Sequence, residues 1–163
     1  MDMTAKELKL KPFTLFDEDW ALLTAGKVDN HNSMTISWGE IGTLWHYDVV
    51  TVYVKPLRYT HDFMERNDLF VVSFFDESFR KALSLMGSKS GRDINKDKES
   101  HLTPTSYKGT TIYKEAKLAL ICKKIYQNDV VLENMPEEEK RRYYEKEAPH
   151  TMYIGEILEV IEQ

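Results

Sequence analysis

Hydroxyl and apolar side chains alternate between residues 32 and 39, and this spacing could recognise a flat ligand. The hydroxyl side of the stretch consists of Ser33, Thr35 and Ser37, and Asn32 stands at its start. A period of two predicts a half-buried strand. Hydroxyl and amide groups both donate and accept hydrogen bonds, so the strand and its backbone could read the edge of a planar heterocycle. Taken alone, the pattern favours an ordinary strand with one solvated face.

The segment 55–60 lies between a predicted strand and a predicted helix, and it could bind a phosphate. A helix N-terminus offers free N–H groups and positive potential, and Arg58 adds a planar guanidinium two residues before Thr60. An ordinary capped loop with an exposed arginine explains the same residues equally well.

A second loop, 88–93, is also suited to an anion. It places Lys89, Arg92, two serines and Gly91 within six residues directly after a predicted helix. Glycine allows the backbone to approach a ligand closely. A solvated charged loop is the usual reading of such a segment. The presence of two such loops in an acidic protein shifts the balance toward anion binding.

Other candidate sites are weaker. The sequence contains no Gly-x-Gly-x-x-Gly or Walker motif, which excludes nucleotide sites of those kinds. The five histidines show no metal-ligand spacing, so no metal is expected. His150 precedes the last predicted strand and could line a pocket or serve a structural role. Cys122 lies in an apolar strand, which favours a buried, inert thiol.

Composition limits the class of protein. The 163 residues predict one domain over 1–163, with 42% hydrophobic residues and a net charge of −5. An acidic chain is not expected to bind nucleic acid or an anionic membrane in general. No apolar run is long enough to span a membrane, and the first twelve residues lack the apolar core of a signal peptide. We therefore expect a cytoplasmic protein.

Local patterns predict several strands and few helices. The first predicted strand ends at Gly26. The other predicted strands cover 32–39, 49–54, 69–75, 110–113, 118–126 and 152–161. The predicted helices cover 61–67 with Thr60 as N-cap, 78–86 with Gly87 as the stop, and 136–147. A turn is expected at 39–42, and 88–106 is expected to be irregular. This order predicts a mostly β fold: an antiparallel β-barrel with flanking helices.

Four stretches occur together in a familiar order. They are 32–39 (NSMTISWG), 54–65 (VKPLRYTHDFME), 86–93 (MGSKSGRD) and 150–157 (HTMYIGEI). Together they resemble the flavin reductase-like proteins with the FMN-binding split-barrel fold, and most closely the flavoredoxin-like branch. The resemblance covers nearly the whole chain.

The resemblance implies a homodimer that binds FMN near its interface. The residues expected along the isoalloxazine are Asn32, Ser33, Met34, Thr35, Ser37 and Trp38, and His150 completes the cofactor-binding set. The residues expected at the phosphate are Arg58, Thr60, Lys89, Ser90 and Arg92. Lys89 and Arg92 are expected to contribute most, because their loop is the densest group of cations and hydroxyls.

The resemblance also implies an FMN-dependent oxidoreductase. Hydride would pass from NADH or NADPH to the flavin, and electrons would pass on to free flavin, a metal complex or a protein partner. The cofactor supplies this chemistry, so no catalytic residue of the protein is expected. The alternatives are a non-catalytic flavin- or haem-binding protein on the same barrel, and a structural interaction domain without a cofactor.

Overall fold

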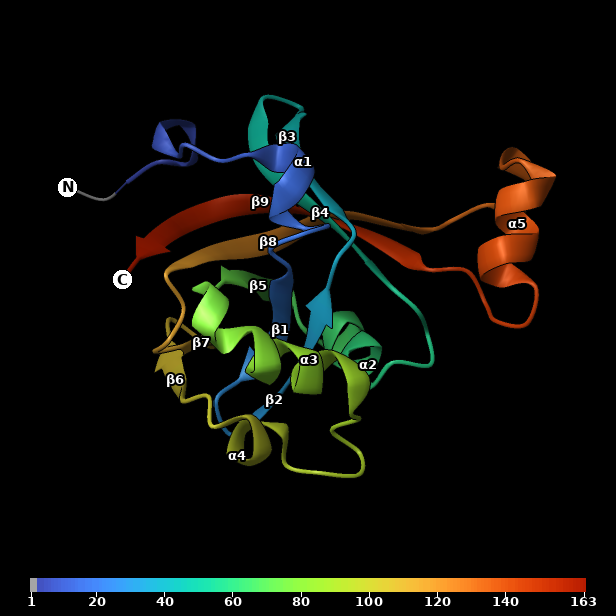
Figure 1. Ribbon diagram of the computed structural model, residues 1–163. Coiled ribbons are helices and arrows are strands. Elements are labelled where there is room, and N and C mark those ends of the chain that lie inside the picture. Colours follow the sequence, from blue (N-terminus) through green and yellow to red (C-terminus); the bar gives the residue numbers. More distant parts are fainter. Residues whose placement is uncertain (1–2) are drawn as a thin grey trace.

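A computed structural model describes residues 3–163 and shows one seven-stranded sheet, antiparallel at every strand pair. The strand order is β2-β1-β5-β8-β9-β4-β3, as Figure 1 shows. The strands of this sheet are β1 (Ala21–Lys27), β2 (Asn30–Ile36), β3 (Gly39–Leu44), β4 (Tyr47–Val54), β5 (Leu69–Phe74), β8 (Leu118–Asp129) and β9 (Thr151–Glu162). A separate hairpin is formed by β6 (Pro104–Tyr107) and β7 (Thr110–Tyr113). The predicted mostly β fold with flanking helices is confirmed.

Short helices lie around the sheet. They are α1 (Pro12–Leu15), α2 (Tyr59–Arg66), α3 (Arg80–Ser88), α4 (Lys96–Ser100) and α5 (Glu137–Tyr144), with 3-10 turns η1 (Ala5–Glu7), η2 (Glu77–Phe79) and η3 (Leu132–Asn134). Helix α5 joins the long strands β8 and β9 and lies away from the rest of the molecule (Figure 1). None of the helices among residues 3–163 is long and apolar enough to cross a membrane.

Strand β1 is buried on both faces, and this double burial organises the core. Leu23 and Ala25 point into the main core with Phe70 of β5, whereas Leu22 packs on the other face against Leu83 of α3. Gly155 of β9 is needed for this packing, because a Cβ there would lie 2.4 Å from the Phe70 ring. The burial explains why β1 is apolar at successive positions rather than at alternate ones.

The turn predicted at 39–42 is wrong, because these residues belong to strand β3. Gly39 and Gly42 pair with Val52 and Val49 of β4. A Cβ on Gly39 would lie 2.8 Å from the Phe16 ring, so this glycine marks close packing rather than a chain reversal. The reversal occurs three residues later than predicted, after Leu44.

The β3–β4 turn places Trp45 and His46 in the left-handed region, with φ of 51° and 64°. Left-handed backbone costs an L-residue about 1–2 kcal/mol, and two-residue turns of this type favour Asn-Gly. We expect the double substitution Trp45→Asn, His46→Gly to stabilise the protein by about 1 kcal/mol and to raise Tm by about 2–4 °C in calorimetry. The control Trp45→Ala, His46→Ala removes the same side chains without relieving the backbone. An equal gain in that control would contradict the prediction.

Two residues predicted to begin or end a helix do not do so in the structure. Helix α2 begins at Tyr59 with Arg58 as its N-cap residue, so Thr60 lies inside the first turn and does not cap the helix. Thr60 is used instead in a tertiary contact with Asn32 (below). Helix α3 continues through Gly87 to Ser88, so Gly87 is not its stop. A Cβ on Gly87 would lie 3.0 Å from Cβ of Thr35 in β2, so this glycine allows α3 to pack closely on the strand.

The segment 88–106 is not irregular throughout. It contains helix α4 and the start of β6. Asn95 caps α4 by accepting a hydrogen bond from the backbone N–H of Lys98 at 3.0 Å.

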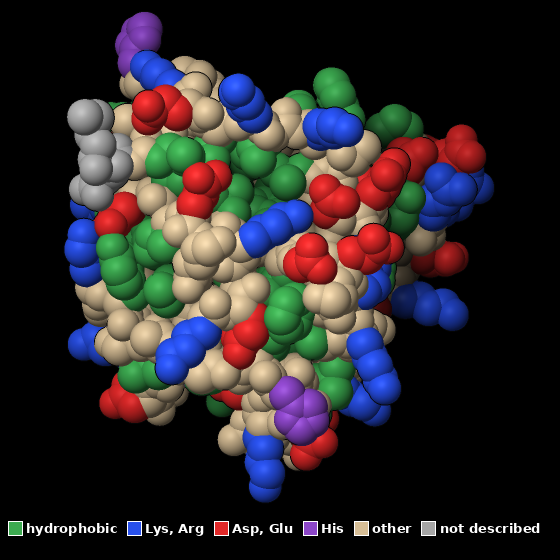
Figure 2. All heavy atoms as spheres, turned by 60° about the vertical axis from the view of Figure 1, so that its left-hand side comes forward, with side chains coloured by type: hydrophobic (Ala, Val, Ile, Leu, Met, Phe, Trp, Pro, Cys, Tyr) green, Lys and Arg blue, Asp and Glu red, His purple; other side chains and the backbone are tan. Residues whose placement is uncertain are grey.

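Figure 2 shows one face of the molecule, on which acidic and basic side chains are interspersed.

Candidate functional site

Two adjoining hollows lie beside strand β2, and together they are called the groove, with the smaller hollow as its narrow end and the larger as its wide end. Its narrow end, about 100 Å³, lies between the start of α2 and the loop 88–91. Its wide end, about 290 Å³, is bordered by Trp38, Tyr53 and His150. Met34 and Arg58 line both ends, so the two hollows adjoin. The groove therefore brings together residues from all four of the stretches singled out in the sequence.

Arg58 stands at the junction of the two ends. Its Nη2 donates a hydrogen bond to the carbonyl oxygen of Gly87 at 2.6 Å, which orients the guanidinium. Burial lowers the pKa of this arginine. Among residues 3–163, no carboxylate lies within 4.0 Å of it. A half-buried cation without a protein counter-ion is suited to an anionic ligand.

Lys96 supplies a second cation that the sequence analysis did not identify. Only 6% of the residue is exposed, and its Nζ donates a hydrogen bond to the backbone oxygen of Ser33 at 2.6 Å. Burial and the nearby charge of Arg58 lower the pKa of Lys96 to about 8, although Asp97 opposes this shift. Arg58 and Lys96 both line the narrow end of the groove, so two cationic side chains meet there.

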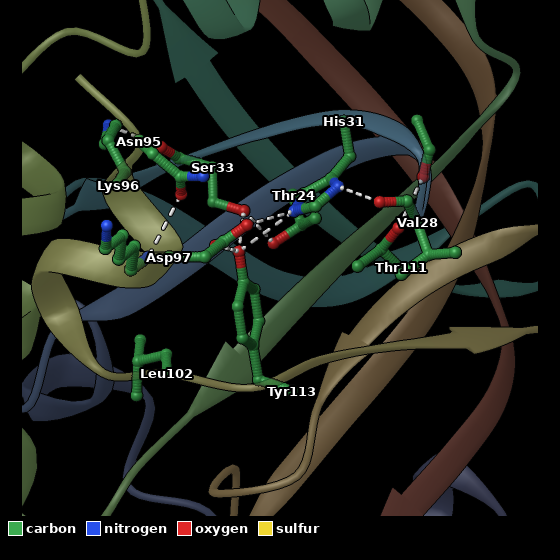
Figure 3. Close-up of polar contacts among 12 residues, drawn as sticks. Thr24, Val28, His31, Ser33, Asn95, Lys96, Asp97, Leu102, Thr111 and Tyr113 are labelled. Carbon is green, nitrogen blue, oxygen red and sulfur yellow. Dashed lines mark hydrogen bonds and ion pairs between the residues drawn. The ribbon is translucent and has the colours of Figure 1, made fainter.

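A buried polar network holds Lys96 in place (Figure 3). Asp97, the next residue of α4, accepts a hydrogen bond from the hydroxyl of Tyr113 at 2.6 Å and lies 2.9 Å from Nε2 of His31. Burial raises the pKa of Asp97, but the hydrogen bonds from His31 and Tyr113 outweigh it and lower the pKa overall. This ionised carboxylate docks α4 against the barrel, and α4 thereby directs Lys96 at β2.

The hydroxyl side of β2 does not face solvent. The Ser33 hydroxyl lies 2.8 Å from Thr24 Oγ1 and 2.9 Å from the Tyr113 hydroxyl, and the Thr35 hydroxyl donates to the carbonyl oxygen of Leu83 at 2.5 Å. The expected half-buried strand is therefore covered on both faces, because α3 and the segment around α4 pack on its polar side. Any contact that Ser33 or Thr35 makes with a ligand would use mainly the backbone, while Ser37 borders the wide end.

The narrow end of the groove contains most of the residues expected at a phosphate. Lys89, Ser90, Thr60 and Arg58 all line it. The Asn32 amide donates to the Thr60 hydroxyl at 2.8 Å, which joins β2 to the start of α2. A Cβ on Gly91 would lie 2.1 Å from Asn32 Oδ1, so only glycine lets the loop 88–91 approach so closely.

Arg92 is placed differently from the other expected phosphate residues. Its Nη2 lies 2.9 Å from Asp62 Oδ2, its Nη1 donates to the carbonyl oxygen of Leu57 at 3.1 Å, and its guanidinium stacks on the Tyr59 ring at 4.6 Å. It lines a neighbouring hollow of about 540 Å³ rather than the narrow end of the groove. Its contribution to phosphate binding stays a prediction.

Aromatic side chains surround the wide end. Trp38 is 46% exposed, and its ring lies 5.4 Å from His150 and 5.3 Å from Tyr143 of α5. Burial and the charge of Lys55 lower the pKa of His150 to about 4, against the opposing effect of Glu147. His150 is therefore neutral near pH 7. Aromatic rings thus border this end of the groove, and such a border suits a flat ring.

The fold and the groove together define a barrel protein suited to a ligand with one anionic end and one flat end. A family model described as the flavin reductase like domain matches residues 15–163. The chain therefore belongs to the flavin reductase-like family. No curated protein matches this chain.

Solved structures share the fold, which is the FMN-binding split barrel. Flavoredoxin of Desulfovibrio vulgaris (Miyazaki F) is 19% identical with a TM-score of 0.71, over 100% of this chain and 77% of that one. Flavoredoxin from Methanosarcina acetivorans is 19% identical with a TM-score of 0.70, over 98% of this chain and 76% of that one. The NADH:FAD oxidoreductase of Streptomyces globisporus is 15% identical with a TM-score of 0.68, over 89% of this chain and 75% of that one.

Proposed function

We propose that this protein binds FMN in the groove and works as an FMN-dependent oxidoreductase. The observation that carries the proposal is the pair of cations, Arg58 and Lys96, at the narrow end of a groove whose wide end is aromatic. Neither cation has a carboxylate within 4.0 Å among residues 3–163. A phosphate at the narrow end would neutralise them, and a flavin ring would occupy the wide end.

The residues of the groove would hold FMN through its phosphate and its ring. Arg58, Lys89 and Lys96 would supply charge to the phosphate, and Thr60 and Ser90 would supply hydrogen bonds. Trp38 and His150 would border the ring. Bound FMN supplies hydride and electron transfer, and the protein supplies binding and orientation.

The electron donor in this proposal is NADH or NADPH, and the acceptor is free flavin, a metal complex or a protein. The name of the Streptomyces globisporus relative, an NADH:FAD oxidoreductase, supports a nicotinamide donor. The test is to titrate the protein with FMN and then add NADH or NADPH without oxygen. Loss of the oxidised flavin absorbance supports the reductase. FMN binding without bleaching would favour a non-catalytic flavoprotein, and no FMN binding would overturn the proposal.

Trp38 offers a local probe of the ring. It borders the wide end of the groove, whereas Trp45 is 59% exposed at the β3–β4 turn. We expect FMN binding to quench tryptophan emission, and we expect Trp38→Leu to abolish most of that quench. Trp45→Leu is the matched control and should keep it. An unchanged quench in the Trp38 variant would place the ring elsewhere.

We propose a homodimer, as the family resemblance implies. Helix α5 has no buried residue and lies away from the barrel (Figure 1). Tyr143 of this helix and Leu158 of β9 are exposed. Such a projecting arm would be covered by a second copy in a symmetric dimer. Light scattering at micromolar concentration with FMN present should give twice the mass of the chain. A monomeric mass would contradict this assembly.

A further inference from the structure

Helix α5 returns to the groove through its last turn and the residues that follow. The Tyr144 hydroxyl oxygen lies 2.7 Å from Nδ1 of His150. The Tyr143 ring meets Trp38 edge to face, and Glu147 forms an ion pair with Lys55. These contacts connect helix α5 and the residues after it to the wide end of the groove, which His150, Trp38 and Lys55 line.

The tautomer of His150 decides the direction of its hydrogen bond with Tyr144. Burial raises the pKa of the Tyr144 hydroxyl, so the hydroxyl keeps its proton near pH 7, and Nδ1 of His150 is its one hydrogen-bond partner among residues 3–163. The proton of the hydroxyl is then available for Nδ1. A neutral imidazole that accepts at Nδ1 carries its own proton at Nε2.

The other ring nitrogen is available to a ligand. Nδ1 is the only ring nitrogen of His150 that hydrogen-bonds within residues 3–163. Nε2 makes no hydrogen bond within residues 3–163, and it is not fully buried, although only 8% of the residue is exposed. His150 lines the wide end of the groove, so Nε2 retains access to solvent on a residue that borders the ring site.

We propose that Tyr144 is a positioning residue that holds His150 as the Nε2–H tautomer, so that a neutral hydrogen-bond donor faces the ring end of the groove. The acceptor would be a carbonyl oxygen or ring nitrogen of a flat heterocycle, and this identity rests on the proposed function. The tautomer itself is a property of the protein without ligand. A neutral donor strengthens its hydrogen bond as negative charge grows on the acceptor, and it adds no fixed charge beside the ring.

The tautomer can be measured directly by NMR. Protein labelled with ¹⁵N-histidine and freed of FMN is examined at pH 7 through two-bond ¹H–¹⁵N correlations, which distinguish Nδ1–H from Nε2–H. We expect His150 in the parent protein to be the Nε2–H form. Tyr144→Phe removes only the hydroxyl and should leave a mixture of both forms. Tyr143→Phe is the matched control: it is the preceding residue, it touches Trp38 through its ring, and it should leave the tautomer unchanged.

Binding provides a second measurement. Riboflavin and FMN share the ring, so Tyr144→Phe should weaken both by the same factor, about two- to tenfold for one neutral hydrogen bond. An Nδ1–H tautomer in the parent protein would overturn the inference whatever the variants do. It would also be overturned if Tyr144→Phe kept the pure Nε2–H form. Failure of the parent to bind FMN would instead overturn the proposed function and leave the tautomer result standing.

Discussion

Replacing Arg58 by alanine is expected to weaken FMN binding about ten- to a hundredfold. Hydrogen bonds to a charged group contribute about 1.5–3 kcal/mol, and each 1.4 kcal/mol is a factor of ten in affinity. Arg58 is half-buried beside the narrow end of the groove and is oriented by the Gly87 carbonyl. Its interaction with a phosphate is therefore less screened by water than that of a surface cation. The measurement is an FMN titration followed by fluorescence or absorbance.

Four comparisons separate the roles of the charge, its position and the phosphate. Arg66→Ala removes an arginine from the other end of helix α2 and should leave the affinity unchanged. Arg58→Lys keeps the charge but not the planar group, so it should lose less than alanine. Arg92→Ala should lose less than Arg58→Ala, because Asp62 already neutralises Arg92. Riboflavin lacks the phosphate, so its binding should fall less than that of FMN. Loss of FMN affinity by at most twofold in Arg58→Ala, a difference of only ~0.4 kcal/mol, would place the phosphate elsewhere.

FMN affinity is expected to fall as pH rises above about 8, and Lys96 is expected to cause this fall. Without ligand the pKa of Lys96 is lowered to about 8, chiefly by burial. A bound phosphate favours the ammonium form and raises that pKa, so binding above pH 8 requires uptake of a proton. Affinity is therefore fully present below pH 8 and should decrease about tenfold between pH 7 and pH 9. Titrations at fixed ionic strength across this range measure the slope.

Lys96→Met is the diagnostic variant, because it keeps the length of the side chain and removes the titrating group. We expect it to bind FMN about ten- to a hundredfold more weakly at pH 7 and to lose the pH slope. Lys89→Met removes an exposed lysine of the same groove and should keep the slope. Circular dichroism checks that each variant is folded. A full slope in Lys96→Met would assign the titration to another group.

Local pattern alone determined the element types and the two anion-suited loops. The strand and helix periodicities identified the antiparallel barrel, and the density of cations and hydroxyls in 88–93 and around Arg58 was visible without any structure. Several of the errors came from glycines. In the sequence, Gly39 and Gly42 look like turn residues. In the structure, Gly39 leaves room for the Phe16 ring, which lies against it. A sequence shows that a residue is small, whereas only packing shows what it makes room for.

The tertiary structure decided which cations are available to a ligand. Arg92 stands in the richest anion motif of the sequence, yet Asp62, thirty residues earlier, pairs with it. Lys96 stands in a segment that reads as a polar loop, yet Asp97 anchors its helix to His31 and Tyr113 and thereby buries the ammonium against Ser33. Charge is a property of the side chain and can be read from the sequence. Burial and pairing are properties of distances between segments, and only the folded chain sets those distances.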